Sequence, residues 1–266
     1  MENLNKKQLL NLKRIFYLSK IDLKKLYNGS VLGWIWLIFR PCFSIFVYYF
    51  ALTIGLKSEK TIFDMPYFFW LISGMVPWFF INDIFHQGCD CIKKYNYLVT
   101  KIKFPVYEVP IFSTLSRFLV HSFLMAIILL IFFIAGYGFN IYLLQLPLYM
   151  FLMLIFFTFL NILLSSLCAI SRDFSNLVKS TSFAIFWFSG ILWEVTSLKI
   201  IWLKDFICCF NPITFLINGY RNCFIKHIWF WEEPLSLLSF TTITITIIIL
   251  SILIYKRVAK DIPDLL

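Results

Sequence analysis

Residues 235–255 read LSLLSFTTITITIIILSILIY and contain no charged side chain. A helix needs about 20 mostly apolar residues to cross the hydrocarbon core of a bilayer. Five further stretches have a suitable length and composition, and they are 34–56, 67–85, 118–137, 142–170 and 177–195. The sequence therefore predicts an all-α integral membrane protein with six transmembrane helices.

The composition of the whole chain agrees with a lipid environment. Of its 266 residues, 61% are hydrophobic, 20% are aromatic and 14% are charged, and the mean hydropathy is +0.82. Soluble domains are about 45–50% apolar and about 25% charged, so a soluble globular enzyme and a disordered chain are both excluded. The net charge of +10 lies in short segments between apolar runs. We therefore do not expect the chain to bind nucleic acid.

The residues before the first apolar stretch differ from a cleavable signal peptide, because they lack a compact apolar region and a small-residue cleavage site. Within 9–26, leucine, isoleucine and phenylalanine gather on one helical face, and lysine and arginine gather on the other. Such a basic amphipathic helix lies in the plane of the lipid headgroups. The alternative is that this helix packs against a soluble partner.

The distribution of cations predicts the orientation of the six crossings. The side that holds both termini contains 17 of the 24 lysine and arginine residues, the other side contains six, and Arg40 lies within the first crossing. Cytoplasmic loops are enriched in lysine and arginine. We therefore expect a multi-pass protein of the cell membrane with both termini in the cytoplasm.

The segment 196–234 is apolar, but charged residues, asparagines and prolines interrupt it, so no part of it is long enough to cross. Short apolar pieces of this kind suit re-entrant or interfacial helices whose backbone is satisfied by protein or water. The segment faces outward in the predicted topology. A disulfide between Cys223 and either Cys208 or Cys209 is possible there if the compartment is oxidising.

The sequence has no convincing catalytic or metal-binding constellation. Glycine is nowhere followed by lysine, so the phosphate-binding loop of a nucleotide-driven motor is missing, and no H-E-x-x-H or G-x-S-x-G motif is present. The seven cysteines lack metal-ligand spacing. For a membrane-embedded transferase, the only hints are Asp83, His86 and His121.

Two other stretches have distinctive patterns. Residues 27–36 read YNGSVLGWIW and form a glycine-containing elbow between the basic helix and the first crossing. Residues 96–110 read NYLVTKIKFPVYEVP and lie in the longest cytoplasmic loop. Its two prolines exclude one uninterrupted helix, so we expect a short helix before Phe104 and a new one after Pro105. Together these would project apolar and basic side chains towards a partner.

The order of these elements resembles the membrane permease subunits of ABC-2 type polysaccharide exporters, which serve O-antigen, capsule and teichoic acid. Five short motifs match in order along the whole chain, although Glu108 stands one place later than in the family pattern. The matching residues are Tyr27, Ser30, Leu32, Gly33, Trp36 and Pro41 at the elbow, Asn96, Leu98, Lys101, Phe104, Pro105 and Pro110 in the loop, Arg172 and Asp173, and Asn211, Pro212, Tyr220 and Arg221 in the outer segment.

The resemblance implies a homodimer that encloses a channel for a lipid-linked glycan. A separate cytoplasmic ATPase would bind ATP and magnesium, so this chain would need no cofactor. It also implies an interface helix and elbow in 1–33, a transmembrane domain in 34–255 with two re-entrant helices in 196–234, and a cytoplasmic tail in 256–266. In that family, the loop residues Asn96, Leu98, Lys101, Phe104 and Pro105 would contact the ATPase.

As channel residues we expect Tyr48 and Tyr49, whose rings suit the apolar faces of sugars, and Arg40, whose charge suits a lipid pyrophosphate. An arginine within the membrane is costly enough to indicate a role, although it can also snorkel to the interface. Two alternatives remain open at this point. One is an ABC-2 permease for a small hydrophobic compound such as a drug, and the other is a membrane-embedded glycosyl- or acyltransferase.

Overall fold

The structure is a computed structural model. It describes the chain except for residues 1, 30, 57–60, 102–103, 260–261 and 263–266, and it describes residues 2–10 and 27 by their backbone only. Within these described residues, five helical segments are long and apolar enough to cross a membrane by length and composition. They are Gly33–Gly55, Tyr67–Gly88, Glu108–Ile134, Ile141–Ile170 and Pro234–Val258. The prediction of an all-α integral membrane protein is thereby confirmed.

Each of these segments is built around one α-helix, and several have a short extension of different pitch. The π-helical turns η2 and η3 extend α2 and α3, and 3-10 turns precede α2 and α7. The bounds are η1 Gly33–Ile35, α2 Trp36–Tyr49, η2 Phe50–Gly55, α3 Tyr67–Asp83, η3 Ile84–Gly88, α6 Glu108–Ile134, η4 Ile141–Gln145, α7 Leu146–Ile170 and α11 Pro234–Val258.

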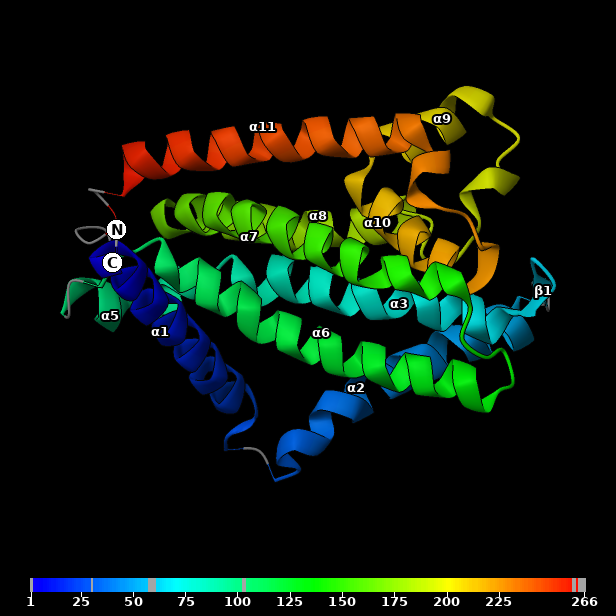
Figure 1. Cartoon of the computed structure of the whole chain (residues 1–266), viewed down its shortest axis with the longest axis horizontal. Helices are drawn as coiled ribbons and strands as arrows, with labels where there is room; N and C mark the ends of the chain where they lie inside the picture. The colour runs from blue at the N-terminus through cyan, green and yellow to red at the C-terminus, as the bar shows by residue number, and fades with distance from the viewer. Residues whose placement is uncertain (1, 30, 57–60, 102–103, 260–261, 263–266) are drawn as a thin grey trace.

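The long helices run along one axis, so the bundle has two distinct ends (Figure 1). The N-terminal helix α1, Glu2–Tyr27, crosses one end, where α11 also finishes. The opposite end holds a small hairpin, β1 Thr61–Ile62 paired antiparallel with β2 Met65–Pro66, together with the short helices that follow α8. We call these the α1 end and the hairpin end.

The fifth predicted crossing corresponds to α8, Arg172–Phe188, which lies beside α7. Its 17 residues span about 25 Å at 1.5 Å per residue, slightly less than the hydrocarbon core of about 30 Å. The helix begins before the predicted 177 because the Ser171 side chain caps it, accepting from the Asp173 amide at 3.1 Å. It ends before 195 because Gly190 adopts a left-handed φ of +64°. The exact number of crossings therefore stays a prediction.

The loop between the second and third long helices contains two short helices, α4 Cys91–Lys94 and α5 Asn96–Thr100. The next helix, α6, begins at Glu108, so the expected break around Phe104 and Pro105 is confirmed. The helix begins ten residues before the predicted start at 118. Pro110 does not prevent this, because it falls in the first turn, where a missing amide hydrogen costs no helical bond. We call residues 91–108 the 91–108 loop.

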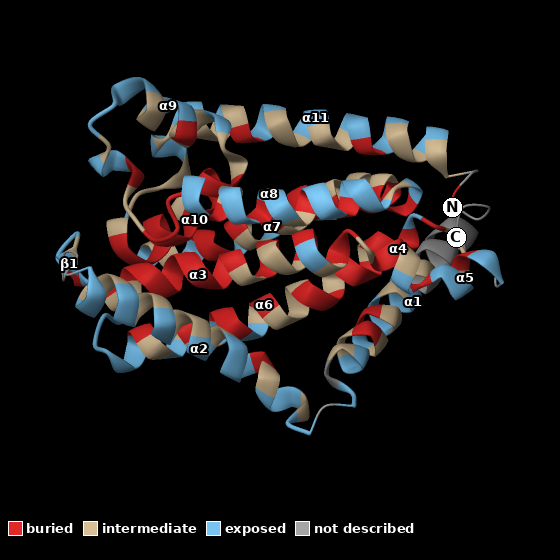
Figure 2. Ribbon diagram, turned by 180° about the vertical axis from the view of Figure 1, so that it is seen from behind, coloured by how far each residue is buried: buried red, intermediate tan, exposed pale blue. Residues whose placement is uncertain are grey.

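The segment between α8 and α11 contains two short helices, as expected, but they differ in environment. α9, Ile201–Phe210, is largely exposed, whereas α10, Pro212–Arg221, is buried among the long helices (Figure 2). Each has ten residues and is about 15 Å long, too short to cross a bilayer. The remaining turns are η5 Val195–Ser197, η6 Asn222–Lys226 and η7 Phe230–Glu232.

The main core surrounds α3, which is the most buried long helix (Figure 2). Helices α6 and α10 pack against it, and aromatic rings fill much of the contact. For example, the Phe80 ring meets the rings of Phe118 and Phe157 edge to face, at centroid distances of 6.0 and 5.6 Å. Edge-to-face pairs of this kind stabilise beyond their area burial.

Gly219 of α10 allows the closest approach in this core. A Cβ atom at this position would lie 2.1 Å from the ring of the buried Tyr149. We therefore expect Gly219→Ala to lower the free energy of unfolding by about 1–3 kcal/mol through overpacking. The measurement is thermal unfolding in detergent, with Gly55→Ala as the control, because no described atom lies within 4 Å of that added Cβ. Equal melting temperatures for the two variants would contradict the packing argument.

Candidate functional site

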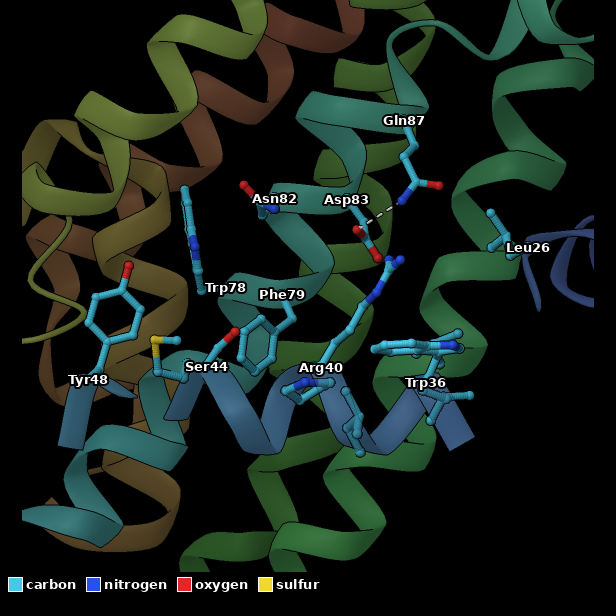
Figure 3. A pocket seen from close by; sticks show the side chains of 15 residues that line it. Leu26, Trp36, Arg40, Ser44, Tyr48, Trp78, Phe79, Asn82, Asp83 and Gln87 are labelled. Atoms are coloured by element: carbon cyan, nitrogen blue, oxygen red, sulfur yellow. Dashed lines mark hydrogen bonds between the residues drawn. The ribbon is translucent and has the colours of Figure 1, made fainter. Parts of the chain in front are cut away.

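A cavity of about 590 Å³ lies between α2 and α3, and residues of α1 and α6 also line it. Figure 3 shows side chains from these elements converging on it. Polar groups come from both sides, from Arg40 and Ser44 of α2 and from Asn82, Asp83 and Gln87 of α3 and η3, and aromatic rings also come from both α2 and α3. Its lining residues are Leu26, Trp36, Leu37, Arg40, Pro41, Ser44, Tyr48, Met75, Trp78, Phe79, Asn82, Asp83, Gln87, Val120 and Leu124.

Arg40 is the cationic group of this cavity. Its guanidinium points towards the Asp83 carboxylate (Figure 3) and lies 5.6 Å from the centre of the Trp36 ring. Gln87 donates a hydrogen bond from Nε2 to Asp83 Oδ1 at 3.4 Å. Charged groups inside a membrane protein are costly and mark ligand or ion pathways. The cavity thus combines one cation, one carboxylate and amide donors with flat aromatic surfaces.

The structure separates the three predicted channel residues. Arg40 and Tyr48 both line the cavity. Tyr49 does not, because its ring packs against Tyr67 and Phe68 at centroid distances of 6.5 and 5.8 Å. The sequence reasoning missed Trp78, Asn82 and Gln87, although these polar and aromatic residues recur every four to five positions, as one face of a helix does.

The Tyr48 ring also forms a boundary of the cavity. It lies 5.3 Å from the Phe186 ring of α8, and Trp78 lies 5.1 Å from the same Phe186 ring. These three rings come from three helices, and two of them, Tyr48 and Trp78, also line the cavity. Aromatic side chains bury large areas and pack in offset or tilted pairs, so this cluster closes the space between α2, α3 and α8.

Helix α1 has an outward apolar face and an inward polar contact. Leu12 and Phe16 are 64% and 44% exposed, as a lipid-facing stripe requires. Ser19 and Asp22 are instead buried against the start of α6. The expected amphipathic helix is present, and its buried side includes a carboxylate that the helical pattern alone did not single out.

The elbow after α1 is described in part. Gly33 has a positive φ of 48° and opens the first membrane segment, and Trp36 of the same motif lines the cavity. Ser30 lies outside the described residues, and for Tyr27 only the backbone is described.

The 91–108 loop packs against α1 through a second apolar cluster, separate from the main core. Buried Tyr95, Val99 and Phe112 belong to it, and Ile15 and Leu18 of α1 pack against it. The cluster consists of Cys91, Ile92, Tyr95, Val99, Val106, Val109, Phe112, Ala169 and Ile262. Ile262, which follows α11, therefore also packs at this end of the molecule.

The five predicted partner-contact residues divide into two groups. Asn96 and Lys101 are exposed, whereas Leu98, Phe104 and Pro105 are half-buried. The Phe104 amide donates to the Leu98 carbonyl at 3.0 Å, which closes the loop. Asn96 and Lys101 are therefore accessible to a partner, whereas the half-buried residues determine the shape of the loop.

In the segment beyond α8, the Asn-Pro pair starts α10. The Asn211 side chain caps the helix by accepting from the amides of Ile213 and Thr214 at 3.0 and 3.4 Å. Pro212 occupies the first helical position, where its fixed φ suits the helix. Asn211 also donates from Nδ2 to the Ser189 hydroxyl at 3.0 Å. This contact ties α10 to the end of α8.

Tyr220 and Arg221 fix the other end of α10 from inside the bundle. The Tyr220 hydroxyl lies 2.8 Å from His121 Nε2 of α6. Arg221 donates to the carbonyls of Gly190 and Ile191, both at 2.6 Å, and its guanidinium lies 3.7 Å from the centre of the Trp70 ring. These side chains are buried and hold α6, α8 and α3 around α10.

The residues considered for enzymatic chemistry have separate partners. His86 Nε2 lies 2.8 Å from the Ser182 hydroxyl, whereas His121 pairs with Tyr220. In the described part of the chain, no three His, Cys, Asp or Glu residues form a group that could hold a metal ion. All seven cysteines are free, so the structure contains no bridge between Cys223 and Cys208 or Cys209.

The fold and the cavity define a multi-pass α-helical membrane protein with a polar cavity inside its bundle. The chain belongs to the ABC-2 type transporter family, whose sequence model matches residues 13–225. The match covers α1 from residue 13 onwards, the cavity, the 91–108 loop and α10. The resemblance seen in the short motifs is therefore confirmed for the family.

Curated relatives have similar length. The O-antigen export system permease protein RfbA of Myxococcus xanthus is 22% identical over 228 residues, which cover 84% of this chain and 85% of the relative. A protein of the same name from Klebsiella pneumoniae is 26% identical over 237 residues, which cover 87% of both chains. This chain is thus similar along most of its length to permeases of O-antigen export.

Proposed function

We propose that this chain is the permease subunit of an ATP-driven exporter that moves a lipid-linked polysaccharide across the cell membrane. Family membership and the two named relatives support this proposal. The observation that carries it is the cavity, which is lined by Arg40 and by the aromatic rings of Trp36, Tyr48 and Trp78. A cation suits a lipid pyrophosphate, and flat aromatic rings suit the C–H faces of sugars.

In this proposal the α1 end faces the cytoplasm and binds a separate ATPase, which holds ATP and magnesium. The sequence itself lacks a phosphate-binding loop. The exposed Asn96 and Lys101 of the 91–108 loop supply contact groups beside α1. Two copies of the chain form the working permease, and the polysaccharide passes between or through their bundles.

Closure of the ATPase pair would push on α1 and the 91–108 loop, and the helices would then shift as rigid bodies. Leu26 of α1 and Val120 of α6 both line the cavity. Movement at the α1 end therefore reaches the cavity wall directly, without any catalytic group in this chain.

Export in cells lacking this chain tests the substrate class. We expect lipid-linked glycan precursors to accumulate inside such cells, and we expect plasmid-borne wild-type protein to clear them. Unchanged glycan export together with increased sensitivity to hydrophobic drugs would identify a small-molecule permease instead. Glycosyl or acyl transfer by the purified protein without an ATPase would identify a membrane-embedded transferase.

The double variant Lys101→Ala with Phe104→Ala tests the partner surface. The Arg14 guanidinium of α1 lies 5.2 Å from the centre of the Phe104 ring. Replacing Phe104 therefore removes a cation–π contact of about 0.5–1 kcal/mol as well as apolar packing. We expect at least about tenfold weaker ATPase binding, which corresponds to about 1.4 kcal/mol, with normal membrane insertion. Co-purification of the ATPase measures this change.

Lys256→Ala is the control, because Lys256 is an exposed lysine at the same end. Normal export with unchanged nucleotide turnover in the double variant would contradict this surface.

A further inference from the structure

We propose that Asp22 is a positioning residue that locks α1, the 91–108 loop and the start of α6 into one body. Through this lock, movement of α1 and the loop would be transmitted to the cavity wall. The proposal rests on the proposed function and adds to it a buried residue that does not touch the ATPase surface. Its basis is a single carboxylate on α1 with partners from two other segments, the 91–108 loop and α6.

The Asp22 side chain is 1% exposed and accepts hydrogen bonds at both oxygens. The Tyr95 hydroxyl donates to Oδ1 at 2.5 Å, and Lys94 Nζ lies 3.0 Å from the same atom. On the other oxygen, the Ser116 hydroxyl donates to Oδ2 at 2.5 Å and Arg117 Nη1 lies 3.4 Å away. One side chain of α1 therefore joins the 91–108 loop to α6.

The electrostatics of the cluster make Asp22 and Arg117 depend on one another. Both side chains are 1% exposed, and Asp22 is the carboxylate that pairs with Arg117 among the described residues. Burial raises the pKa of Asp22, but the Arg117 charge and the hydrogen bonds from Ser116 and Tyr95 outweigh it, and the net pKa lies below the ordinary 3.8. Asp22 is therefore ionised at neutral pH, and removing it leaves a buried cation unpaired.

Two further contacts keep α1 aligned with the loop. Arg14 forms an ion pair with Glu108 at the first residue of α6. Lys25 donates from Nζ to the Tyr97 hydroxyl at 3.4 Å. These contacts lie on either side of Asp22 along α1, so rotation of α1 relative to the loop would break at least one of them. Asp22 differs from Arg14 and Lys25 because its own side chain is buried, as are three of its four partners, Tyr95, Ser116 and Arg117.

The cluster lies one helical turn from the cavity along two helices. Leu26 stands four residues after Asp22 on α1, and Val120 stands four residues after Ser116 on α6. Residues four apart lie on the same helical face, and both Leu26 and Val120 line the cavity. A displacement that α1 and the loop share is thereby applied to two walls of the cavity at once.

A simpler role for Asp22 would be charge balance alone. Breaking a buried pair is strongly destabilising because it leaves one charge uncompensated, whereas replacing both charges is often neutral. The double variant Asp22→Asn with Arg117→Met separates the two roles. It removes the unpaired cation and also the ionic contact between α1 and α6, and the asparagine amide retains only one of the two acceptor oxygens.

The experiment compares wild type, Asp22→Asn and this double variant, each as full-length protein with its ATPase. Three quantities are measured: the melting temperature, amide hydrogen exchange of the permease alone, and glycan exported per ATP hydrolysed. We expect Asp22→Asn to melt at a lower temperature, to exchange faster in both 11–27 and 96–100, and to export at least fivefold less per ATP. We expect the double variant to recover the melting temperature but not the export ratio.

Asp90→Asn is the matched control. Asp90 accepts from the Ser175 hydroxyl at 2.8 Å and pairs with Lys179, so it ties α8 to the turn after η3 at the same end of the bundle. This variant should leave exchange in 11–27 unchanged.

Recovery of both the melting temperature and the export ratio in the double variant would reduce Asp22 to a charge partner and overturn the proposal. An unchanged export ratio in Asp22→Asn would do the same. Wild-type protein that neither binds an ATPase nor exports glycan would overturn the proposed function itself. The exchange measurement would still report whether Asp22 ties α1 to the loop, so the two failures are distinguishable.

Discussion

Replacing Arg221 by methionine will destabilise the folded protein by about 3–5 kcal/mol, because two carbonyl groups lose a charged donor inside the bundle. Arg221 is 1% exposed and donates to Gly190 and Ile191 directly after α8. The substitution also removes the cation–π contact with Trp70, which is worth about 2 kcal/mol when desolvated. These contributions are not additive, so the expected total is less than their sum.

Thermal unfolding in detergent measures the Arg221→Met effect, and a drop of roughly 10 °C is expected from the usual relation between stability and melting temperature. Arg172→Met is the control, because Arg172 is exposed at the start of α8. Gly74→Ala supplies a second test, since its Cβ would lie 2.7 Å from an Arg221 nitrogen and displace the guanidinium. If Arg221→Met and the Arg172→Met control melt at the same temperature, Arg221 does not stabilise the fold and the structural role assigned to it is wrong. Its guanidinium would then be available to act on a ligand.

The second large effect concerns the cavity. Arg40→Ala should weaken binding of a polyprenyl pyrophosphate about tenfold or more, because a charge-assisted contact with phosphate is lost in a low-dielectric setting. Asp83→Asn should strengthen the same binding, because its carboxylate faces the cavity and repels the anion. The two substitutions thus shift affinity in opposite directions.

Quenching of tryptophan fluorescence in nanodiscs measures this binding, since Trp36 and Trp78 stand in the cavity wall. The uncharged polyprenol is the control ligand, and its affinity should change little in either variant. Tyr49→Phe is the control variant, because Tyr49 lies outside the cavity lining. Equal affinity of wild type and Arg40→Ala for the pyrophosphate would exclude Arg40 from the substrate path.

Several features followed directly from local sequence. The apolar run at 235–255 became α11, and Pro105 lies in the break between α5 and α6. Asn211 and Pro212 started α10 by capping and by a fixed φ. These features depend on side chains and backbone within a few residues, so a single stretch of chain contains the whole cause.

Other features depended on contacts between distant segments. The basic helix 9–26 was expected from its two faces, but its burial of Asp22 against Ser116 and Arg117 was not. Likewise, the sequence identified Arg221 only as part of a motif, whereas the structure shows that it donates hydrogen bonds to the carbonyls after α8. Sequence spacing gives no information on such pairs, because their partners lie about 30 to 95 positions apart.

By itself, the sequence determined that the chain is helical and lies in a membrane, since each helix needs only its own length and apolar surface to be stable in lipid. It also determined the order of elements that defines the family. Only the tertiary structure decided which polar side chains face a cavity and which are structural. Inside a bundle, each buried polar group must find a partner, and that partner is set by how helices pack against one another.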